Sequence, residues 1–199
     1  MAQTTDKPKG RVLIIAGSDS GGGAGIQADI KTVSALGGYA MTAITAVTVQ
    51  NTLGVTDVHA VPPDIVRAQI EAVMGDLGAD TWKIGMMGSA DHVRAVLEAW
   101  YAVGAGAPVI LDPVMIAKGG ASLLNEDAIE VIRDELMPIA AMVTPNAPEA
   151  EALTGVAVHD LDGQMDAADV LVNRLGAWSA LVKGGHIHGS TVRDVLLTQ

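Results

Sequence analysis

The chain alternates short apolar segments with amphipathic ones, and this alternation constrains its fold more than any other feature. Apolar residues on both faces are typical of strands inside a parallel sheet, whereas apolar residues at helical spacing indicate helices packed on that sheet. Strands are expected at 11–16, 41–49, 81–85, 109–111, 141–144, 180–183 and 192–197, the last as a hairpin partner of the one before. Helices are expected around 26–33, 63–77, 93–100, 129–136, from 147, and over 165–175. The pattern predicts a single α/β domain with about seven strands and helices on both faces of a mostly parallel sheet.

Composition and charge exclude several classes of protein. With 49% hydrophobic residues among 199, the chain can fill one large core, so disorder is excluded. A net charge of -11 argues against binding to nucleic acid or to an anionic membrane. Cysteine is absent, which excludes disulfides and a thiolate site in these residues. No apolar run is long enough to span a bilayer and residues 1–10 are polar, so a cytoplasmic protein is expected.

Polar residues and glycines gather where the expected strands end. They are Gly17-Ser18-Asp19, Gln50-Asn51, Gly85-Met86, Asp112-Pro113, Thr144-Pro145-Asn146 and Lys183-Gly184-Gly185. Open α/β sheets bind their ligands outside the carboxyl ends of the strands. The sequence therefore predicts a small-molecule site along this rim.

A loop with five glycines in nine residues runs from Gly17 to Gly25, between the first strand and the first helix. Glycines let the backbone approach a ligand closely, and a helix N-terminus offers unpaired N–H groups. The loop is not a P-loop, because Gly23 stands where that motif requires lysine. Gly23 to Ala28 fits a dinucleotide fingerprint, but Gln50 stands where its acidic ribose partner is expected. A plain tight turn is the remaining alternative.

Several rim residues have both a structural and a functional interpretation. Gln50 carries a donor and an acceptor, which suits an aminopyrimidine edge, or it simply ends a strand. Asp29 lies one turn into a helix, where an acid also complements the helix dipole. Asn146 and Glu149 form a capping-box pattern, and their oxygens also suit magnesium beside nucleotide phosphates. The two interpretations of this pair are compatible.

Other polar residues are open to the same two interpretations. Asp112 before Pro113 is a second candidate acid near the metal, or the start of a turn. Lys183 beside two glycines suits phosphate charge, or forms a hairpin turn. The segment 118–120 is a candidate flap or a surface loop. The histidines show no metal-binding spacing, and His188 is expected to be exposed.

Six motifs in order resemble one known family. They are Gln27-Ala28-Asp29 after the glycine loop, Ala46 to Thr52, Lys83 to Met86, Leu111 to Met115, Val143 to Glu149 and Val182 to His186. Over about residues 11–199 the chain resembles the hydroxymethylpyrimidine/phosphomethylpyrimidine kinases of thiamine biosynthesis, within the ribokinase-like superfamily. The resemblance implies 1–10 as an N-terminal extension and 11–199 as a single ribokinase-like α/β domain.

The resemblance also implies an activity and a site. Such kinases move the γ-phosphoryl group of ATP to the hydroxymethyl group of a pyrimidine, and then phosphorylate the monophosphate. The implied pyrimidine pocket consists of Gly17, Ala24, Asp29, Thr48, Gln50, Met86 and Val114. Asn146, Glu149 and Lys183 would serve the nucleotide, with Asp112 and Glu149 at Mg²⁺. A homodimer is expected on the same ground.

One departure from the family concerns its Gly-Thr-Gly-Cys motif, which carries the catalytic residue and is absent here. The chain is also shorter than is usual in the family. We therefore expect a C-terminally incomplete domain with uncovered sheet surface, as a trimmed form or a fragment without turnover, and no catalytic residue is assigned. The alternatives are a pyridoxal kinase, a non-catalytic pyrimidine-binding module and, last, a dinucleotide-dependent oxidoreductase.

Overall fold

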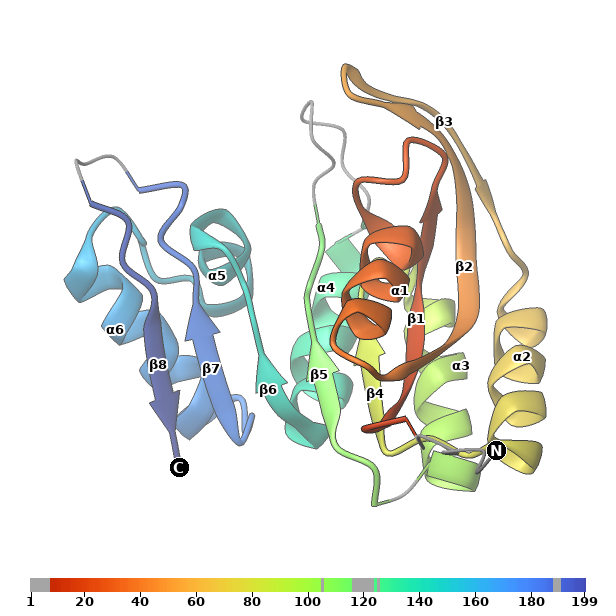
Figure 1. Cartoon of the computed structure of the whole chain (residues 1–199). Helices are drawn as coiled ribbons and strands as arrows, with labels where there is room; N and C mark the ends of the chain where they lie inside the picture. Colours follow the sequence, from red (N-terminus) through yellow and green to blue (C-terminus); the bar gives the residue numbers. More distant parts are fainter. Residues whose placement is uncertain (1–7, 105, 116–123, 125, 188–190) are drawn as a thin grey trace, which may run out of the picture.

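A computed structural model describes residues 8–104, 106–115, 124, 126–187 and 191–199. In this part of the chain, eight strands form one sheet in the order β3-β2-β1-β4-β5-β6-β7-β8 (Figure 1). They are β1 (Arg11–Asp19), β2 (Tyr39–Asn51), β3 (Gly54–Ala60), β4 (Thr81–Ile84), β5 (Val109–Leu111), β6 (Ala140–Val143), β7 (Ser179–Val182) and β8 (Val195–Thr198). Only the two edge strands, β3 and β8, pair in the antiparallel sense. The predicted α/β fold with a mostly parallel sheet is confirmed.

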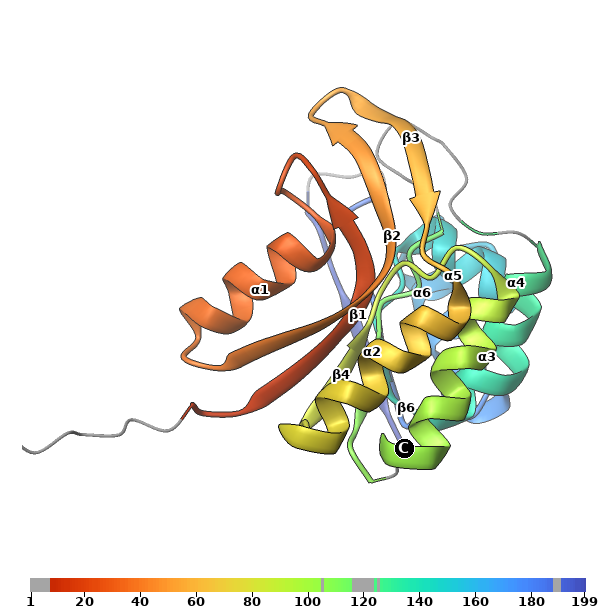
Figure 2. The same cartoon turned by 90° about the vertical axis from the view of Figure 1, so that its right-hand side faces the viewer.

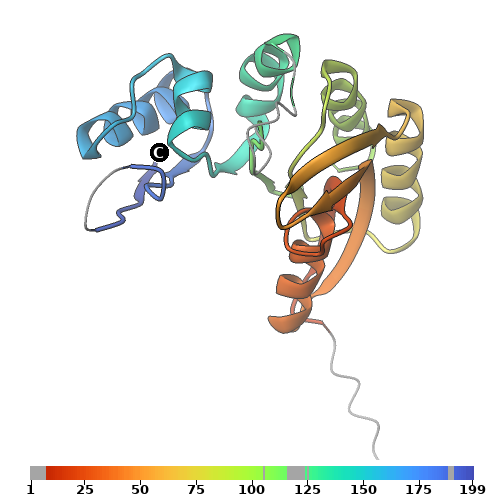
Figure 3. The same cartoon turned by 90° about the horizontal axis from the view of Figure 1, so that it is seen from above.

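Helices cover the two faces of the sheet unequally. They are α1 (Gly25–Ala35), α2 (Pro63–Asp76), α3 (Ala90–Ala99), α4 (Glu126–Val131), α5 (Ala147–Thr154) and α6 (Leu161–Asp169). Wider π-helical turns continue α3, α4 and α6 over Trp100–Gly104, Ile132–Leu136 and Val170–Arg174, and a 3₁₀ turn covers Met137–Ile139. Figures 2 and 3 show α1 on one face and α2 to α6 on the other. Among the described residues, no helix combines the length and apolar character needed to cross a membrane.

The central strand β1 is buried on both faces, which explains its continuous apolar sequence. Leu13 and Ile15 belong to the main core beneath α2 to α6. The alternate residues Ile14 and Ala16 form a smaller cluster with Ile26 of α1. Because side chains alternate along a strand, one apolar run contributes to two cores. The carboxyl end of the same strand leads into the glycine loop.

The strand count and one helix boundary differ from the sequence-based expectation. Strand β3 was not predicted, and it pairs along the outer edge of β2. Helix α6 begins at Leu161 rather than near residue 165, because Asp160 caps it by accepting a hydrogen bond from the Gly163 N–H at 2.9 Å. The predicted hairpin between the last two strands is confirmed as β7 and β8.

The sheet face that carries α1 is uncovered over β5 to β8 in the described structure. Ile110, Met142 and Leu181 lie half-buried on this face, and Leu196 beside Leu181 is 57% exposed. The expected uncovered sheet surface is therefore present.

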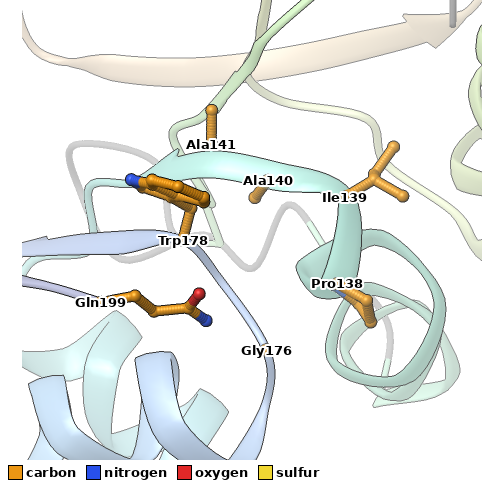
Figure 4. A pocket seen from close by; sticks show the side chains of 7 residues that line it. All are labelled: Pro138, Ile139, Ala140, Ala141, Gly176, Trp178 and Gln199. Atoms are coloured by element: carbon orange, nitrogen blue, oxygen red, sulfur yellow. The ribbon is translucent and has the colours of Figure 1, made fainter. Parts of the chain in front are cut away.

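A cavity of about 350 Å³ opens at the amino ends of β6 and β7 (Figure 4). It lies between Trp178 and Gln199 on one side and Pro138 and Ile139 on the other, and its wall is completed by Ala140, Ala141 and Gly176.

Candidate substrate and nucleotide site

The carboxyl ends of β1, β2 and β4 bring four of the predicted pyrimidine-pocket residues together. At Gly17 a side-chain carbon would lie 3.2 Å from the sulfur of Met86, so the two residues are in close contact. The Thr48 hydroxyl lies 3.2 Å from Gln50 Oε1 and 3.0 Å from the Ser18 carbonyl oxygen. These contacts place the Gln50 amide beside Thr48, whose hydroxyl also reaches the residue that follows Gly17.

The backbone of Gln50 is fixed to the glycine loop through Ser20. The Gln50 N–H donates to Ser20 Oγ at 2.8 Å, and the Ser20 hydroxyl donates to the Gln50 carbonyl oxygen at 2.7 Å. The loop and the end of β2 are thus held together by a reciprocal pair of hydrogen bonds. A side chain on a fixed backbone loses less conformational entropy when a ligand binds.

Asp19 organises the glycine loop from inside, a role that the sequence analysis missed. The residue is 5% exposed, and its carboxylate accepts hydrogen bonds from the N–H groups of Gly21 at 2.7 Å, Gly23 at 2.9 Å and Ala24 at 2.8 Å. Successive loop amides form an anion-binding concavity, and Asp19 fills it with an internal anion. These amides are therefore not free to bind a phosphate, and the loop acts as a shaped wall.

A row of alternating charges crosses the rim from α1 to the end of β7. Lys83 Nζ lies 2.8 Å from Asp29 Oδ2 and 3.9 Å from Asp112 Oδ2. Lys183 Nζ lies 3.1 Å from Asp112 Oδ1. The row links Asp29, which was predicted for the pyrimidine pocket, to Asp112 and Lys183, which were predicted for the nucleotide side. Lys83 was not assigned a role from the sequence.

Asn146 and Glu149 form the predicted capping box at the start of α5. The Asn146 side chain accepts from the Glu149 N–H at 2.9 Å, and the Glu149 carboxylate accepts from the Asn146 N–H at 2.8 Å. A β-bridge places Asn146 beside Lys183, so both residues belong to the rim. The cap and the position at the rim coexist, as the sequence allowed.

Burial raises the pKa of the Glu149 carboxyl group, which is 6% exposed. The hydrogen bond from Asn146 and the charge of Lys183 oppose that rise, Asp112 adds to it, and His186 opposes it. The net rise in pKa means that the surroundings do not fully compensate the buried carboxylate. A cation beside this group would provide the missing charge.

The donor set is compatible with a magnesium ion, although the described residues contain no cluster of three or more histidine, cysteine or acidic side chains that could hold a metal. Magnesium commonly uses only one or two carboxylates, together with phosphate oxygens and water. Asp112 and Glu149 supply two carboxylates close enough for the charge of one to raise the pKa of the other. The residues therefore fit a metal held jointly with a nucleotide.

The remaining predicted residues lie around these two groups. Ala24 lies directly before α1 and its N–H donates to Asp19, while the N–H of the half-buried Val114 donates to the Asp112 carbonyl oxygen. A cavity of about 220 Å³ shares Met86 with the predicted pocket and extends behind β2 and β3 to the buried His92. The candidate flap at 118–120 and His188 lie outside the described residues.

Sequence and structure comparisons identify the relatives of this chain. The phosphomethylpyrimidine kinase family profile matches residues 19–199. The hydroxymethylpyrimidine/phosphomethylpyrimidine kinase of Mycobacterium leprae is 49% identical over 180 residues, which are 90% of this chain and 64% of that protein. The chain thus spans a little under two thirds of the length of this relative.

Solved structures of two kinds of vitamin kinase share the fold. The crystal structure of phosphomethylpyrimidine kinase from Clostridium difficile 630 superposes with a TM-score of 0.86 at 42% identity, covering 95% of this chain and 80% of that one. Staphylococcus aureus pyridoxal kinase in complex with AMP-PCP and pyridoxal gives a TM-score of 0.84 at 32% identity, covering 94% and 67%. With these matches and the ordered strand-end motifs, the chain belongs to the phosphomethylpyrimidine kinase family and has its ribokinase-like fold.

Proposed function

We propose that this protein is a pyrimidine kinase of thiamine biosynthesis. The proposed reaction transfers the γ-phosphoryl group of ATP to the hydroxymethyl group of 4-amino-5-hydroxymethyl-2-methylpyrimidine, and then phosphorylates the monophosphate. The observation that carries the proposal is the Gln50 amide at the rim, whose oxygen lies 3.2 Å from the Thr48 hydroxyl on a backbone that Ser20 ties to the glycine loop. Action in the cytoplasm and as a homodimer are further predictions of the same proposal.

On the pyrimidine side, recognition rests on the Gln50 amide. Its oxygen can accept from the exocyclic amine of the ring while its N–H₂ donates to a ring nitrogen. The thioether of Met86 offers a polarisable surface for the ring, and Val114 would pack against it from the segment after β5. Asp29, held by Lys83, would accept a hydrogen bond from the substrate.

On the nucleotide side, the proposed roles follow from charge. Lys183 would neutralise phosphate oxygens, and Asn146 would contribute its amide N–H₂, because its oxygen already caps α5. Asp112 and Glu149 would hold Mg²⁺ together with the phosphates, and the ion would supply charge neutralisation for the transferring group. The described residues thus bind and orient two substrates, which is the larger part of catalysis in phosphoryl transfer. No residue of this chain is assigned as the catalytic residue.

Replacing Gln50 with leucine tests the proposal. Gln50→Leu removes both hydrogen bonds while keeping a similar volume, so the dissociation constant for the pyrimidine should rise roughly ten- to a hundredfold. Affinity for ATP should remain nearly unchanged. Calorimetric titration of each ligand into the whole chain measures both values. Val49→Leu is the matched control, because Val49 neighbours Gln50 on β2 but is 57% exposed.

Pyridoxal phosphorylation is the second candidate, favoured by the match to the Staphylococcus aureus structure that holds pyridoxal. ATP consumption with each alcohol distinguishes the two: faster turnover of pyridoxal would overturn the preference for the pyrimidine. Binding of the pyrimidine without consumption of ATP would instead identify a non-catalytic binding module. An unchanged pyrimidine affinity in Gln50→Leu would reject the role assigned to Gln50.

A further inference from the structure

Lys83 is a charged residue on a sheet face where its neighbours in register are apolar. Strand β4 places it between Ile14 of β1 and Ile110 of β5, on the face opposite the fully buried Trp82 and Ile84. Its side chain is only 22% exposed. A half-buried ammonium group is unfavourable unless it is paired, so its contacts should account for its presence.

Those contacts come from two elements that are distant in the sequence. Asp29 of α1 accepts a hydrogen bond from Lys83 Nζ at 2.8 Å, and Asp112 after β5 lies 3.9 Å away. In the described part of the chain, Asp29 Oδ1 has no hydrogen-bond partner, so it remains available to a donor on a ligand. Lys83 thus restrains one oxygen of Asp29 and leaves the other free.

The end of β4 leaves room for this arrangement. A side-chain carbon at Gly85 would lie 3.0 Å from Lys83 Nζ and 3.1 Å from Ala16 Cβ, so any larger residue would press on the ammonium group. The glycine therefore lets the lysine side chain extend along the strand end toward Asp29. Lysine on an apolar face, a glycine beside its ammonium and two carboxylates form a coherent arrangement.

We propose that Lys83 is a positioning residue, which holds the Asp29 carboxylate in place for the hydroxymethylpyrimidine and joins the pyrimidine half of the site to Asp112 in the nucleotide half. The inference rests on the proposed function, because it assigns Asp29 to the pyrimidine. A purely structural ion pair would instead contribute only to stability, and an exposed pair would contribute little even there. The two roles predict different effects of a Lys83 substitution on pyrimidine affinity when Asp29 is also replaced.

A double-mutant cycle on pyrimidine affinity separates these roles. Lys83→Met keeps the aliphatic stem and removes the charge, and it should weaken binding of 4-amino-5-hydroxymethyl-2-methylpyrimidine about tenfold, as expected for a lost charged contact. In the Asp29→Asn background the same change should have no more than about a twofold effect, because Lys83 acts through Asp29. Lys83→Arg, which keeps the charge, should restore part of the affinity. Calorimetry measures the pyrimidine affinity of the unchanged chain, of Lys83→Met, of Asp29→Asn, of the double variant and of Lys83→Arg.

The matched control is Arg11→Gln, which breaks the Arg11–Asp80 ion pair at the opposite end of β1 and should leave pyrimidine affinity unchanged. Equal affinities of Lys83→Met and the unchanged chain, or equal losses in both backgrounds, would overturn the inference while the proposed function stands. If Lys83→Met does not fold, an affinity of Lys83→Arg that is insensitive to Asp29→Asn would overturn it equally. Absence of pyrimidine binding by the unchanged chain would reject the proposed function itself, and this inference with it.

Discussion

At the scale of single residues, Asp19 determines what the glycine loop can bind. The loop has the glycine content of a phosphate-binding loop, yet its amides donate to Asp19 rather than to solvent. Charged acceptors form stronger hydrogen bonds than neutral ones, so the loop conformation is stabilised by its own carboxylate. The pocket wall is thus formed before any ligand arrives.

Asp19→Asn should therefore destabilise the protein although it changes a single atom. Asparagine has a single acceptor oxygen, so its N–H₂ would face at least one of the three loop N–H groups and leave that donor without an acceptor, at a cost of about 1–3 kcal/mol in the free energy of unfolding. Urea denaturation measures the loss. Asp76→Asn is the control, since Asp76 is exposed at the end of α2 and its replacement should change stability by less than about 0.5 kcal/mol. Equal effects of both variants would contradict the role of Asp19.

Glu149→Gln should separate the cap from the proposed metal site. Glutamine can still accept from the Asn146 N–H, so the cap survives, while Mg²⁺-dependent nucleotide binding should weaken because a negative charge is lost. If the protein is active, kcat should fall clearly while Tm changes little. A clear fall in Tm with little change in kcat would instead favour a role of Glu149 as a cap alone.

The raised pKa of Glu149 also predicts how the effect on stability depends on pH. The folded protein holds this proton more tightly than the unfolded chain, so protonation stabilises the fold. Stability is lost as the pH rises from the ordinary glutamate value of about 4.3 through the raised value. Glu149→Gln lacks this loss, so its Tm relative to the unchanged chain should be higher at pH 7 than at pH 4. Thermal unfolding across this range would contradict the prediction if the difference had the opposite sign.

The sequence predicted residues whose function depends on local neighbours better than those whose function depends on distant ones. The capping box of Asn146 and Glu149 spans one helical turn, so its pattern can be recognised in the sequence. Lys83 and Asp29 are 54 positions apart, and no local pattern reveals their contact. Asp19 could have been recognised, because aspartate just before a run of glycines commonly binds the backbone ahead of it.

At the scale of elements, the junction between β1 and α1 depends on one backbone conformation. Gly25 has φ of +55°, and a side-chain carbon there would lie within 2.3 Å of the Gly17 carbonyl oxygen. Only glycine fits such an approach without displacement of the backbone. Gly25 is thus a position of the glycine loop that requires glycine for the fold, next to the Gly17–Met86 contact.

Gly25→Ala should consequently distort the loop. Positive φ alone costs about 1–3 kcal/mol for a non-glycine residue, and the clash with Gly17 adds to it. We expect a lower Tm and weaker pyrimidine binding. Gly23→Ala is a matched control in the same loop, since its side-chain carbon would meet nothing closer than 3.9 Å. Tolerance of Gly25→Ala at the level of Gly23→Ala would show that the junction is less constrained than the structure indicates.

Buried elements were predictable and edge elements were less so. The strands β1 and β5 carry apolar residues on both faces, so they stand out in the sequence. Strand β3 is exposed over its last five residues and carries Asp57 and His59, so it lacks the apolar signal. Its pairing depends on β2, which no property of its own sequence specifies.

At the scale of the whole molecule, the two faces of the sheet are covered to different extents. Helices α2 to α6 cover one face, while α1 covers the other over β1 and β2 (Figure 3). The charged rim and the Trp178 cavity are separate, since the cavity lies at the amino ends of β6 and β7 whereas the rim lies at the carboxyl ends of the strands. A ligand at the rim therefore need not contact this cavity.

Tryptophan fluorescence should report this asymmetry. Trp82 is fully buried and Trp178 is 62% exposed, so acrylamide should quench a component that Trp178→Phe removes. The remaining emission should be blue-shifted and less accessible to quencher. Quenching that is unchanged in Trp178→Phe would mean that the surface around Trp178 is covered in solution.

The antiparallel edges have a consequence for the order of assembly. Strands β2 and β3 are joined by a two-residue turn, and β7 and β8 are also consecutive in the sequence. Both edge pairs can therefore form through contacts between residues that are close in the sequence. The centre is different, because β1 can align with β4 only after α1, β2, β3 and α2 have been looped out between them. Distant encounters form more slowly than local ones. The rate-limiting event in folding should therefore be the meeting of β1 with β4, the same meeting that brings Lys83 to Asp29.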